Sequence, residues 1–464
     1  MMNKAFSLFL VALIGACGRN EKAATSTYFA GEIVNPTSEY IVLYQGEQVL
    51  DSARLDAHNH FEIRIDSLKA GLYHFVHHPE RQYVYLEPGD SMQMRLNTVS
   101  FDESLAFSGK GEVINTYLIN LFLDAENEEN LIRDSYIRME PELFLAKMDS
   151  LRDDKLGTLE ELRQEEGLSD GAYEMARASI LYKNFFYRES YPFWHRKLSV
   201  DKTFHELPAN FYDYREAVSY NDPELVFLRP YYEFMIYHIG NLAYMQCRGA
   251  CDTQSQAIKS QLHFDKHRLK LIDSLVPQDE LRDNLFRTVA FEYLLKNDSE
   301  ENFEKFMADF HQLAGNNRHL GEIEDLSEGI RNLRPNHPLP ALHVWNTDNQ
   351  QVLLSEIAPG NQKKEVVFYF WSGPEPRHIK NISEKVRELE ERHPELRFVG
   401  ICLRTDKEQW KNLLGVYGLD PKWQYWADDF DKFAHTLVVY HPYKSIISRD
   451  GMIVDGFANL NTSF

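Results

Sequence analysis

The chain has 464 residues, of which 43% are hydrophobic and 26% are charged. This composition is ordinary for a globular protein, and the length suffices for about three domains. Its 50 Lys and Arg residues against 71 Asp and Glu residues give a formal net charge of −21. Nucleic-acid binding needs clustered positive charge, so this balance argues against nucleic acid as a partner.

The first residues have the pattern of a secretory signal peptide. Lys4 supplies a positive charge, and the apolar run 5–14 that follows is too short to span a bilayer as a permanent helix. The segment 14–17 (IGAC) resembles a bacterial lipobox. The resemblance implies that residues 1–16 are removed and that Cys17 is lipidated, with residues 17–27 as a tether. It places the protein in the cell envelope, anchored to a membrane at the periplasmic face or in the outer membrane; secretion without lipidation is the alternative.

Residues 28–108 contain short runs with strand character, separated by turns rich in Asn, Gly and Pro. Their even spacing predicts a small antiparallel β-sandwich. His77 and His78 lie beside Glu80, but neighbouring residues on a strand point to opposite faces. A solvated loop end is therefore a better interpretation of these histidines than a metal site.

Residues 109–333 are predicted to be helical, without the fixed period of a regular solenoid. Aromatic residues are dense in 182–194 and 227–237. Such density favours packing between helices, and a ligand groove is the alternative.

Residues 334–464 follow a proline-containing linker and show an α/β alternation. The expected elements are a strand at 366–371, a helix at 375–392, a strand at 397–403, a helix at 406–417, and strands at 438–447 and 452–457. The predicted fold class is thus multidomain α+β: an N-terminal antiparallel β-sandwich, a helical middle region and a C-terminal α/β domain.

The buried strand VVFYFW at 366–371, with the turn and helix after it, resembles the thioredoxin fold, in particular the TlpA and redoxin-like group. In that group the strand leads into Cys-x-x-Cys at a helix N-terminus. Aligned on Phe370-Trp371, the motif here is Glu375-Pro376-Arg377-His378. Residues 28–108 similarly resemble the small β domain that precedes thioredoxin-like domains in Gram-negative envelope lipoproteins.

The resemblance implies a degenerate active site. In the family a thiolate at the helix start attacks a disulfide and a second cysteine resolves the intermediate. Glu375 and His378 can do neither, and the family's buried acid aligns with Tyr369. We therefore expect no dithiol–disulfide oxidoreductase activity and no cofactor.

A second family feature is the loop Tyr440-His441-Pro442, which resembles the loop that carries the family's cis-proline. The resemblance implies a cis bond before Pro442 and brings Glu375, His378 and His441 together. Three interpretations of this trio remain: a peptide-binding surface, a zinc or copper site, or polar replacements without a role.

The remaining cysteines suggest an alternative activity. Cys402 lies in a predicted strand and is expected in the core. Cys247 and Cys251 could form a local disulfide or remain two thiols, and the neighbouring sequence offers no further metal ligands. The favoured function is binding or scaffolding of envelope proteins or peptides; the alternative is a thiol–disulfide oxidoreductase acting through Cys247 and Cys251.

The end of the chain departs from the family as well. Residues 457–464 are too few and too polar for the helix that usually closes the fold. One face of the sheet is therefore expected to be covered by the helical region or to stay open to a partner.

Overall fold

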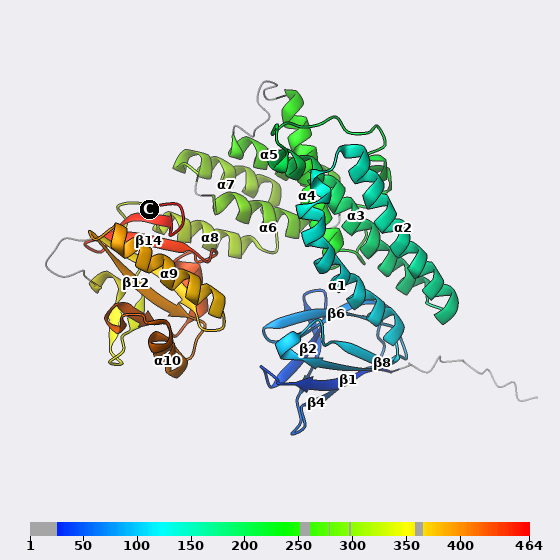
Figure 1. Ribbon diagram of the computed structural model, residues 1–464, viewed down its shortest axis with the longest axis horizontal. Helices are drawn as coiled ribbons and strands as arrows, with labels where there is room; N and C mark the ends of the chain where they lie inside the picture. Colours follow the sequence, from blue (N-terminus) through cyan, green and yellow to red (C-terminus); the bar gives the residue numbers. More distant parts are fainter. Residues whose placement is uncertain (1–25, 251–259, 278, 297, 358–364) are drawn as a thin grey trace, which may run out of the picture. The chain divides into compact units, whose positions relative to one another are not determined.

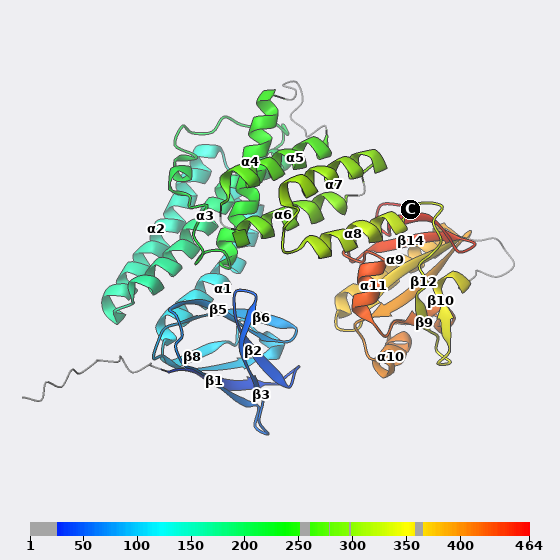
Figure 2. The same ribbon diagram turned by 180° about the vertical axis from the view of Figure 1, so that it is seen from behind.

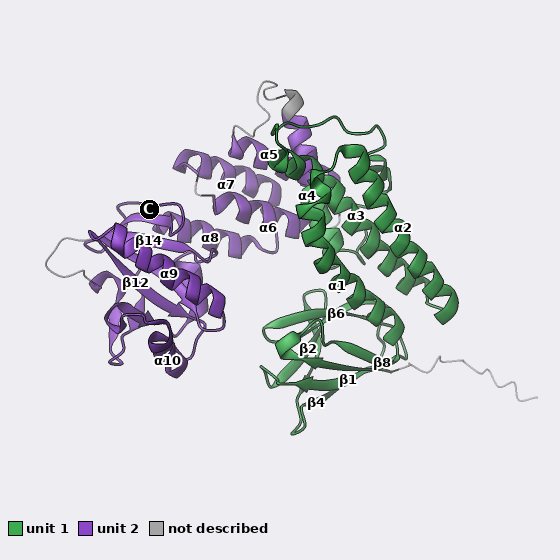
Figure 3. Ribbon diagram, viewed as in Figure 1, with its two compact units in different colours: residues 1–237 green, residues 238–464 purple. Residues whose placement is uncertain are grey.

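The computed structural model describes residues 26–250, 260–277, 279–296, 298–357 and 365–464 (Figure 1). The predicted signal peptide, Cys17 and Cys251 lie outside these residues. Within the described ranges, no helix has both the length and the hydropathy that crossing a bilayer requires. The chain forms two compact units, residues 1–237 and 238–464 (Figure 3). Their boundary falls inside α4 (Arg229–Ala250), within the predicted helical region.

The first unit begins with two four-stranded sheets, in the orders β4-β1-β7-β8 and β3-β2-β5-β6. The first sheet is not purely antiparallel as predicted, since β1 pairs in parallel with β7. The strand bounds are β1 (Thr27–Val34), β2 (Tyr40–Gln45), β3 (Gln48–Arg54), β4 (His60–Ile65), β5 (Gly71–His77), β6 (Glu80–Leu86), β7 (Ser91–Asn97) and β8 (Ala106–Lys110).

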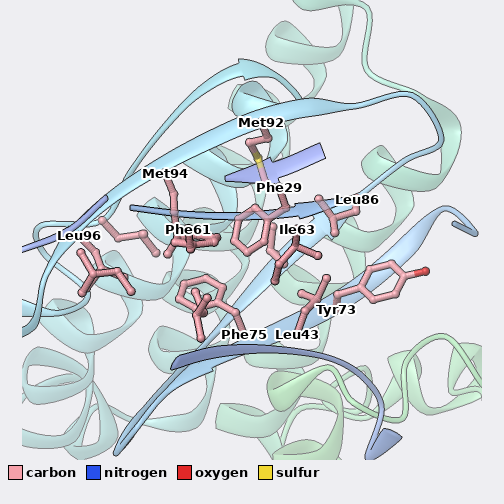
Figure 4. Close-up of a cluster of buried hydrophobic side chains, with 14 of the residues drawn as sticks. Phe29, Leu43, Phe61, Ile63, Tyr73, Phe75, Leu86, Met92, Met94 and Leu96 are labelled. Atoms are coloured by element: carbon pink, nitrogen blue, oxygen red, sulfur yellow. The ribbon is translucent and has the colours of Figure 1, made fainter. Parts of the chain in front are cut away.

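The core of this β region forms largely from alternate, inward-pointing residues, as in β4 and β7. Phe29 lies against Phe61 and Phe75, with ring centroids 5.4 and 5.7 Å apart (Figure 4). His77 is fully buried at the end of β5: its Nε2 accepts from the N–H of Thr37 at 3.0 Å. The prediction of a solvated loop end was wrong for His77, because the segment from Thr37 to Tyr40, which leads into β2, uses both nitrogens of the imidazole.

Three long helices follow in this unit: α1 (Glu112–Asp134), α2 (Pro141–Glu166) and α3 (Asp170–Leu198). The aromatic residues of α3 lie mainly in the packing between helices. Tyr191, for example, is buried and stacks on Phe144 of α2 at 4.0 Å between centroids. A cavity of about 150 Å³ adjoins α3, but of the aromatic residues in 182–194 only Tyr187 lines it.

The second unit contains α5 (Gln261–Leu275), α6 (Asp279–Leu294), α7 (Glu300–Ala314) and α8 (Leu320–Asn332), followed by an α/β portion. Its sheet has the order β10-β9-β13-β12-β11-β14-β15. The bounds are β9 (His343–Trp345), β10 (Gln351–Leu353), β11 (Glu365–Ser372), α9 (Pro376–Arg392), β12 (Leu396–Leu403), α10 (Lys407–Tyr417), β13 (Gln424–Trp426), α11 (Phe430–Thr436), β14 (Lys444–Arg449) and β15 (Met452–Asn459).

The strand order around β11 is that of a thioredoxin-type fold. The strand pairs in parallel with β12 on one side and antiparallel with β14 on the other, and β14 pairs antiparallel with β15. The opposite views of Figures 1 and 2 show α9 and α11 on opposite faces of this sheet. The strand predicted at 438–447 starts only at Lys444, because α11 and a loop occupy the residues before it.

The segment after α8 lies against the edge strand β15 of the sheet. A Cβ atom on Gly456 of β15 would lie 2.0 Å from the carbonyl oxygen of Leu333, just after α8. The linker continues along the same strand, where the N–H of Asn336 donates to the carbonyl of Ile453 at 2.8 Å. The last residue, Phe464, packs against Phe398 at 5.8 Å between centroids. The region after α8 therefore borders the edge strand β15, while cover of a sheet face by the helical region stays a prediction.

Candidate functional site

The candidate site begins where β11 ends and α9 starts. The N–H of Gly373 donates to Oγ1 of Thr405 at 2.7 Å, and a Cβ on Gly373 would lie 2.7 Å from the methyl group of Thr405. The turn can therefore lie close to the loop after β12. Glu375 caps the helix without a side-chain hydrogen bond to it, and Pro376 takes the first helical position, where no N–H is needed. The side chain of Glu375 is exposed.

His378 reaches the loop before β14. Its Nε2 lies 2.9 Å from the carbonyl oxygen of Pro442, so the imidazole donates at this nitrogen. Its ring also meets Tyr443 edge to face, at 5.7 Å between centroids. The predicted proximity of His378 to this loop is thus present.

The bond between His441 and Pro442 is not cis as predicted; among the described residues the cis peptide bond precedes Pro79. The N–H of Lys444 donates to the carbonyl of His441 at 3.0 Å, which places Pro442 in the second position of a β-turn. A trans proline suits that position, because the ring presets the φ angle of the turn. The local turn thus differs from the cis-proline geometry that the resemblance of the sequence implies.

The three residues of the predicted trio do not form a metal-ligand set. His378 and His441 both border Tyr443, the latter at 6.1 Å between ring centroids. Nδ1 of His441 accepts from the N–H of Tyr443 at 3.1 Å. In the described part of the chain, the ligand atoms of Glu375, His378 and His441 do not gather within the spacing that a shared metal ion requires. The zinc or copper interpretation of this trio is therefore not supported.

A neutral hydrogen-bond network occupies the region of the family's buried acid. Tyr369 is 1% exposed, and its hydroxyl accepts from Nε2 of Gln424 at 2.7 Å. Oε1 of Gln424 accepts in turn from the indole of Trp371 at 3.0 Å. Burial raises the pKa of Tyr369 far above its usual value. The network of Tyr369, Gln424 and Trp371 contains no carboxylate that could accept a proton near neutral pH. In this respect Tyr369 differs from the buried acid of a redox thioredoxin.

The cysteine in the α/β portion is Cys402, which is fully buried in β12. Burial raises the pKa of its thiol to about 12. The nucleophile in disulfide exchange is the thiolate, so Cys402 cannot start that reaction at ordinary pH. Its predicted place in the core is confirmed.

The structure adds one cluster that the sequence analysis missed. Sγ of Cys247 lies 3.3 Å from Nδ1 of His267, and His263 completes the group. The two histidines are remote in sequence from Cys247, and only the His-x-x-x-His spacing could have indicated them.

Comparison with known proteins gives fold-level likenesses only. No protein-family model matches the chain, and no curated protein does. Among solved structures, a thioredoxin-like protein from Bacteroides caccae shares 11% identity over 54% of this chain and 87% of its own, with a TM-score of 0.31. The thioredoxin domain of a thiol-disulfide oxidoreductase from Bacteroides vulgatus shares 16% identity over 26% of this chain and 87% of its own (TM-score 0.23).

A third likeness is to a secreted disulfide oxidoreductase of Mycobacterium tuberculosis, with 20% identity over 26% of this chain and 83% of that one (TM-score 0.20). Scores this low carry no argument about activity, and the fold assignment rests on the strand order and pairing around β11. The C-terminal part of the chain has a thioredoxin-type fold.

Proposed function

We propose that this protein is a lipid-anchored protein of the cell envelope whose thioredoxin-type portion binds protein or peptide partners and does not exchange disulfides. The proposal rests on the chemistry of the cysteine and of the helix start in that portion. Its cysteine is buried with a raised pKa, while Glu375 and His378 stand at the helix start. A surface shaped for polypeptide substrates in redox relatives is thereby left without a nucleophile.

The surface offers side chains rather than free main-chain groups. His378 donates a hydrogen bond to the carbonyl of Pro442, and the N–H of Lys444 donates one to the carbonyl of His441. A peptide cannot add to these two carbonyls as an extra strand without displacing those donors. The half-buried ring of Tyr443, bordered by two imidazoles, together with the exposed Arg377, supplies the aromatic and charged contacts that a partner would use.

Insulin reduction tests the redox part of the proposal. The purified protein with a dithiol reductant is expected to reduce insulin no faster than the reductant alone. Reduction above that level would reject the proposal. If it also disappeared in a Cys247→Ser variant, the alternative oxidoreductase acting through Cys247 and Cys251 would be supported instead.

Peptide binding can be tested with a fluorescent, permanently unfolded polypeptide whose cysteines are blocked. Tyr443→Ala is expected to weaken binding about tenfold, since aromatic anchors at interfaces contribute on the order of 1–2 kcal/mol or more. His343→Ala, which removes an exposed imidazole from β9, serves as the matched control and is expected to leave binding unchanged. Equal affinities for all three proteins would contradict the proposed surface.

The lipid anchor rests on the resemblance of residues 14–17 to a lipobox. Metabolic labelling with a fatty-acid analogue is expected to label the protein in the bacterial envelope, and Cys17→Ser is expected to abolish the label. Labelling that survives in Cys17→Ser would place the lipid on another residue. Absence of label from both proteins would reject the proposed lipid anchor.

A further inference from the structure

Three side chains that can bind metal come together between two helices of the second unit. Cys247 lies near the end of α4, and His263 and His267 lie one turn apart on α5. Their ligand atoms all fall within 4.8 Å of one another. Sγ of Cys247 is 3.3 Å from Nδ1 of His267, and the two imidazole centroids are 4.4 Å apart. Residues four apart in a helix share a face, which is why both rings meet the same thiol.

The histidine-bearing helix is held firmly in place from its other side. Asp265 and Arg268 are buried and form an ion pair at 3.0 Å, and Nζ of Lys296 from the region after α6 lies 3.6 Å from Asp265. Arg268 also binds Glu292 of α6 at 2.5 Å. The start of the helix is capped by Ser260, whose hydroxyl accepts from the N–H of His263 at 3.2 Å. These contacts fix the rotation of α5 about its axis and with it the direction in which the two imidazoles point.

We propose that Cys247, His263 and His267 form a binding site for a thiophilic divalent transition-metal ion of the Zn²⁺ class. One thiolate and two imidazoles are a ligand set that zinc favours. With Zn–S near 2.3 Å and Zn–N near 2.0–2.1 Å, tetrahedral geometry puts these donor atoms roughly 3.3–3.6 Å apart. The observed Sγ–Nδ1 distance of 3.3 Å already fits, and the third donor needs a movement of about 1.5 Å at most.

The exposure of the site is compatible with a metal ion. His263 is exposed and the other two ligands are half-buried, so an ion can enter from solvent. Three protein ligands leave the fourth position of a tetrahedral ion to water or to a substrate.

The same geometry has a competing explanation, a thiol activated by a neighbouring imidazole without any metal. Addition of Co²⁺ distinguishes a metal site from an activated thiol without metal. A thiolate bound to Co²⁺ gives a sulfur-to-metal charge-transfer band in the near ultraviolet, whereas an activated thiol alone gives none.

The experiment uses the full chain with Cys17→Ser and Cys251→Ser under a non-thiol reductant, so that Cys247 and the buried Cys402 are the remaining thiols. Co²⁺ is expected to bind once per chain with the charge-transfer band, and Zn²⁺ is expected to displace it and to slow alkylation of Cys247. His263→Ala and His267→Ala are each expected to weaken binding at least about tenfold, and Cys247→Ser to abolish the band.

His311→Ala, which removes a histidine from the exposed face of α7 in the same unit, is the matched control and is expected to leave the titration unchanged. Circular dichroism of each variant confirms that it folds. Absence of the charge-transfer band, or Co²⁺ binding that survives in both His263→Ala and His267→Ala, would overturn the proposal. The proposed peptide-binding surface is tested separately, since the binding assay with Tyr443→Ala and His343→Ala does not involve these three residues.

Discussion

The imidazole of His378 and the main-chain carbonyl of Pro442 are hydrogen-bonded, with 2.9 Å between Nε2 and O. The bond joins the start of α9 to the loop before β14, at the two places where the resemblance of the sequence implies a cysteine and a cis-proline. The histidine thus ties this loop to the helix start and occupies one of its carbonyls.

Removing this bond is expected to loosen the loop. His378→Ala should lower the free energy of unfolding by about 0.5–1.5 kcal/mol, the usual contribution of one hydrogen bond. Hydrogen exchange at the amides of residues 443 and 444 should become faster than in the parent protein. His343→Ala is the control with an exposed imidazole elsewhere on the sheet. Unchanged exchange in His378→Ala would show that the loop is held by other contacts.

Gly400 leaves room for the hydrogen-bond network of Tyr369, Gln424 and Trp371. Its replacement by alanine and the replacement of Gly415 by alanine should change the stability of the protein in opposite directions. A Cβ on Gly400 would lie 2.1 Å from Oε1 of Gln424 and 2.8 Å from the hydroxyl of Tyr369. Gly400→Ala should therefore cost about 1–3 kcal/mol of stability through overpacking.

Gly415 lies inside α10 with nothing near its added Cβ. Gly415→Ala should stabilise the protein by roughly 0.5–1 kcal/mol, because alanine is the better helix former. Urea unfolding of both variants measures the difference. A loss of stability in Gly415→Ala as large as that in Gly400→Ala would contradict the packing argument.

Cysteines placed at positions 375 and 378 should form a disulfide bond but should not make the protein an efficient oxidoreductase. Glu375→Cys combined with His378→Cys puts two thiols in the first turn of α9, where the helix N-terminus favours a thiolate. The double variant should form an intramolecular disulfide on oxidation, detectable by alkylation and mass spectrometry, while each single variant stays a thiol. Insulin reduction should remain slow because Tyr369 takes the place of the family's acid. Fast turnover would show that neither the acid nor a cis-proline is required.

Lys444 should give stability an unusual pH dependence. The residue is 6% exposed, its Nζ lies 3.8 Å from the ring centroid of Phe457, and it donates to the carbonyl of Gly456. Burial lowers its pKa to about 7, against a partial offset from Asp455. Between about pH 7 and pH 10 the unfolded chain binds more protons at this lysine than the folded chain, so its contribution to the unfolding free energy rises with pH.

Lys444→Met removes this contribution. The variant should gain stability relative to the parent near pH 7 and below, and the gain should shrink as the pH rises towards about 10. Denaturant unfolding across that range measures the difference between the two proteins. A difference that does not change with pH would mean that Lys444 keeps an ordinary pKa in the folded state.

Much of the α/β portion could be predicted locally. The apolar run before Ser372 and the helical spacing of Ile379, Ile382 and Val386 predicted β11 and α9 to within about one residue, because strand and helix periods are short-range properties. The residue types at the start of the helix, Glu375 and His378, could be read directly from the sequence. The short β13 and α11 were missed, since short elements carry too little periodicity to be recognised.

The sequence by itself therefore determined the central strand, the helix that follows it and the residue types at the helix start, because each depends on neighbours a few positions away. Only the tertiary structure decided that Leu333 covers β15 at Gly456, that Pro442 sits in a trans turn, and that Cys247 meets His263 and His267. These features depend on how separate elements pack, and the energy of such contacts comes from side chains that the chain order keeps far apart.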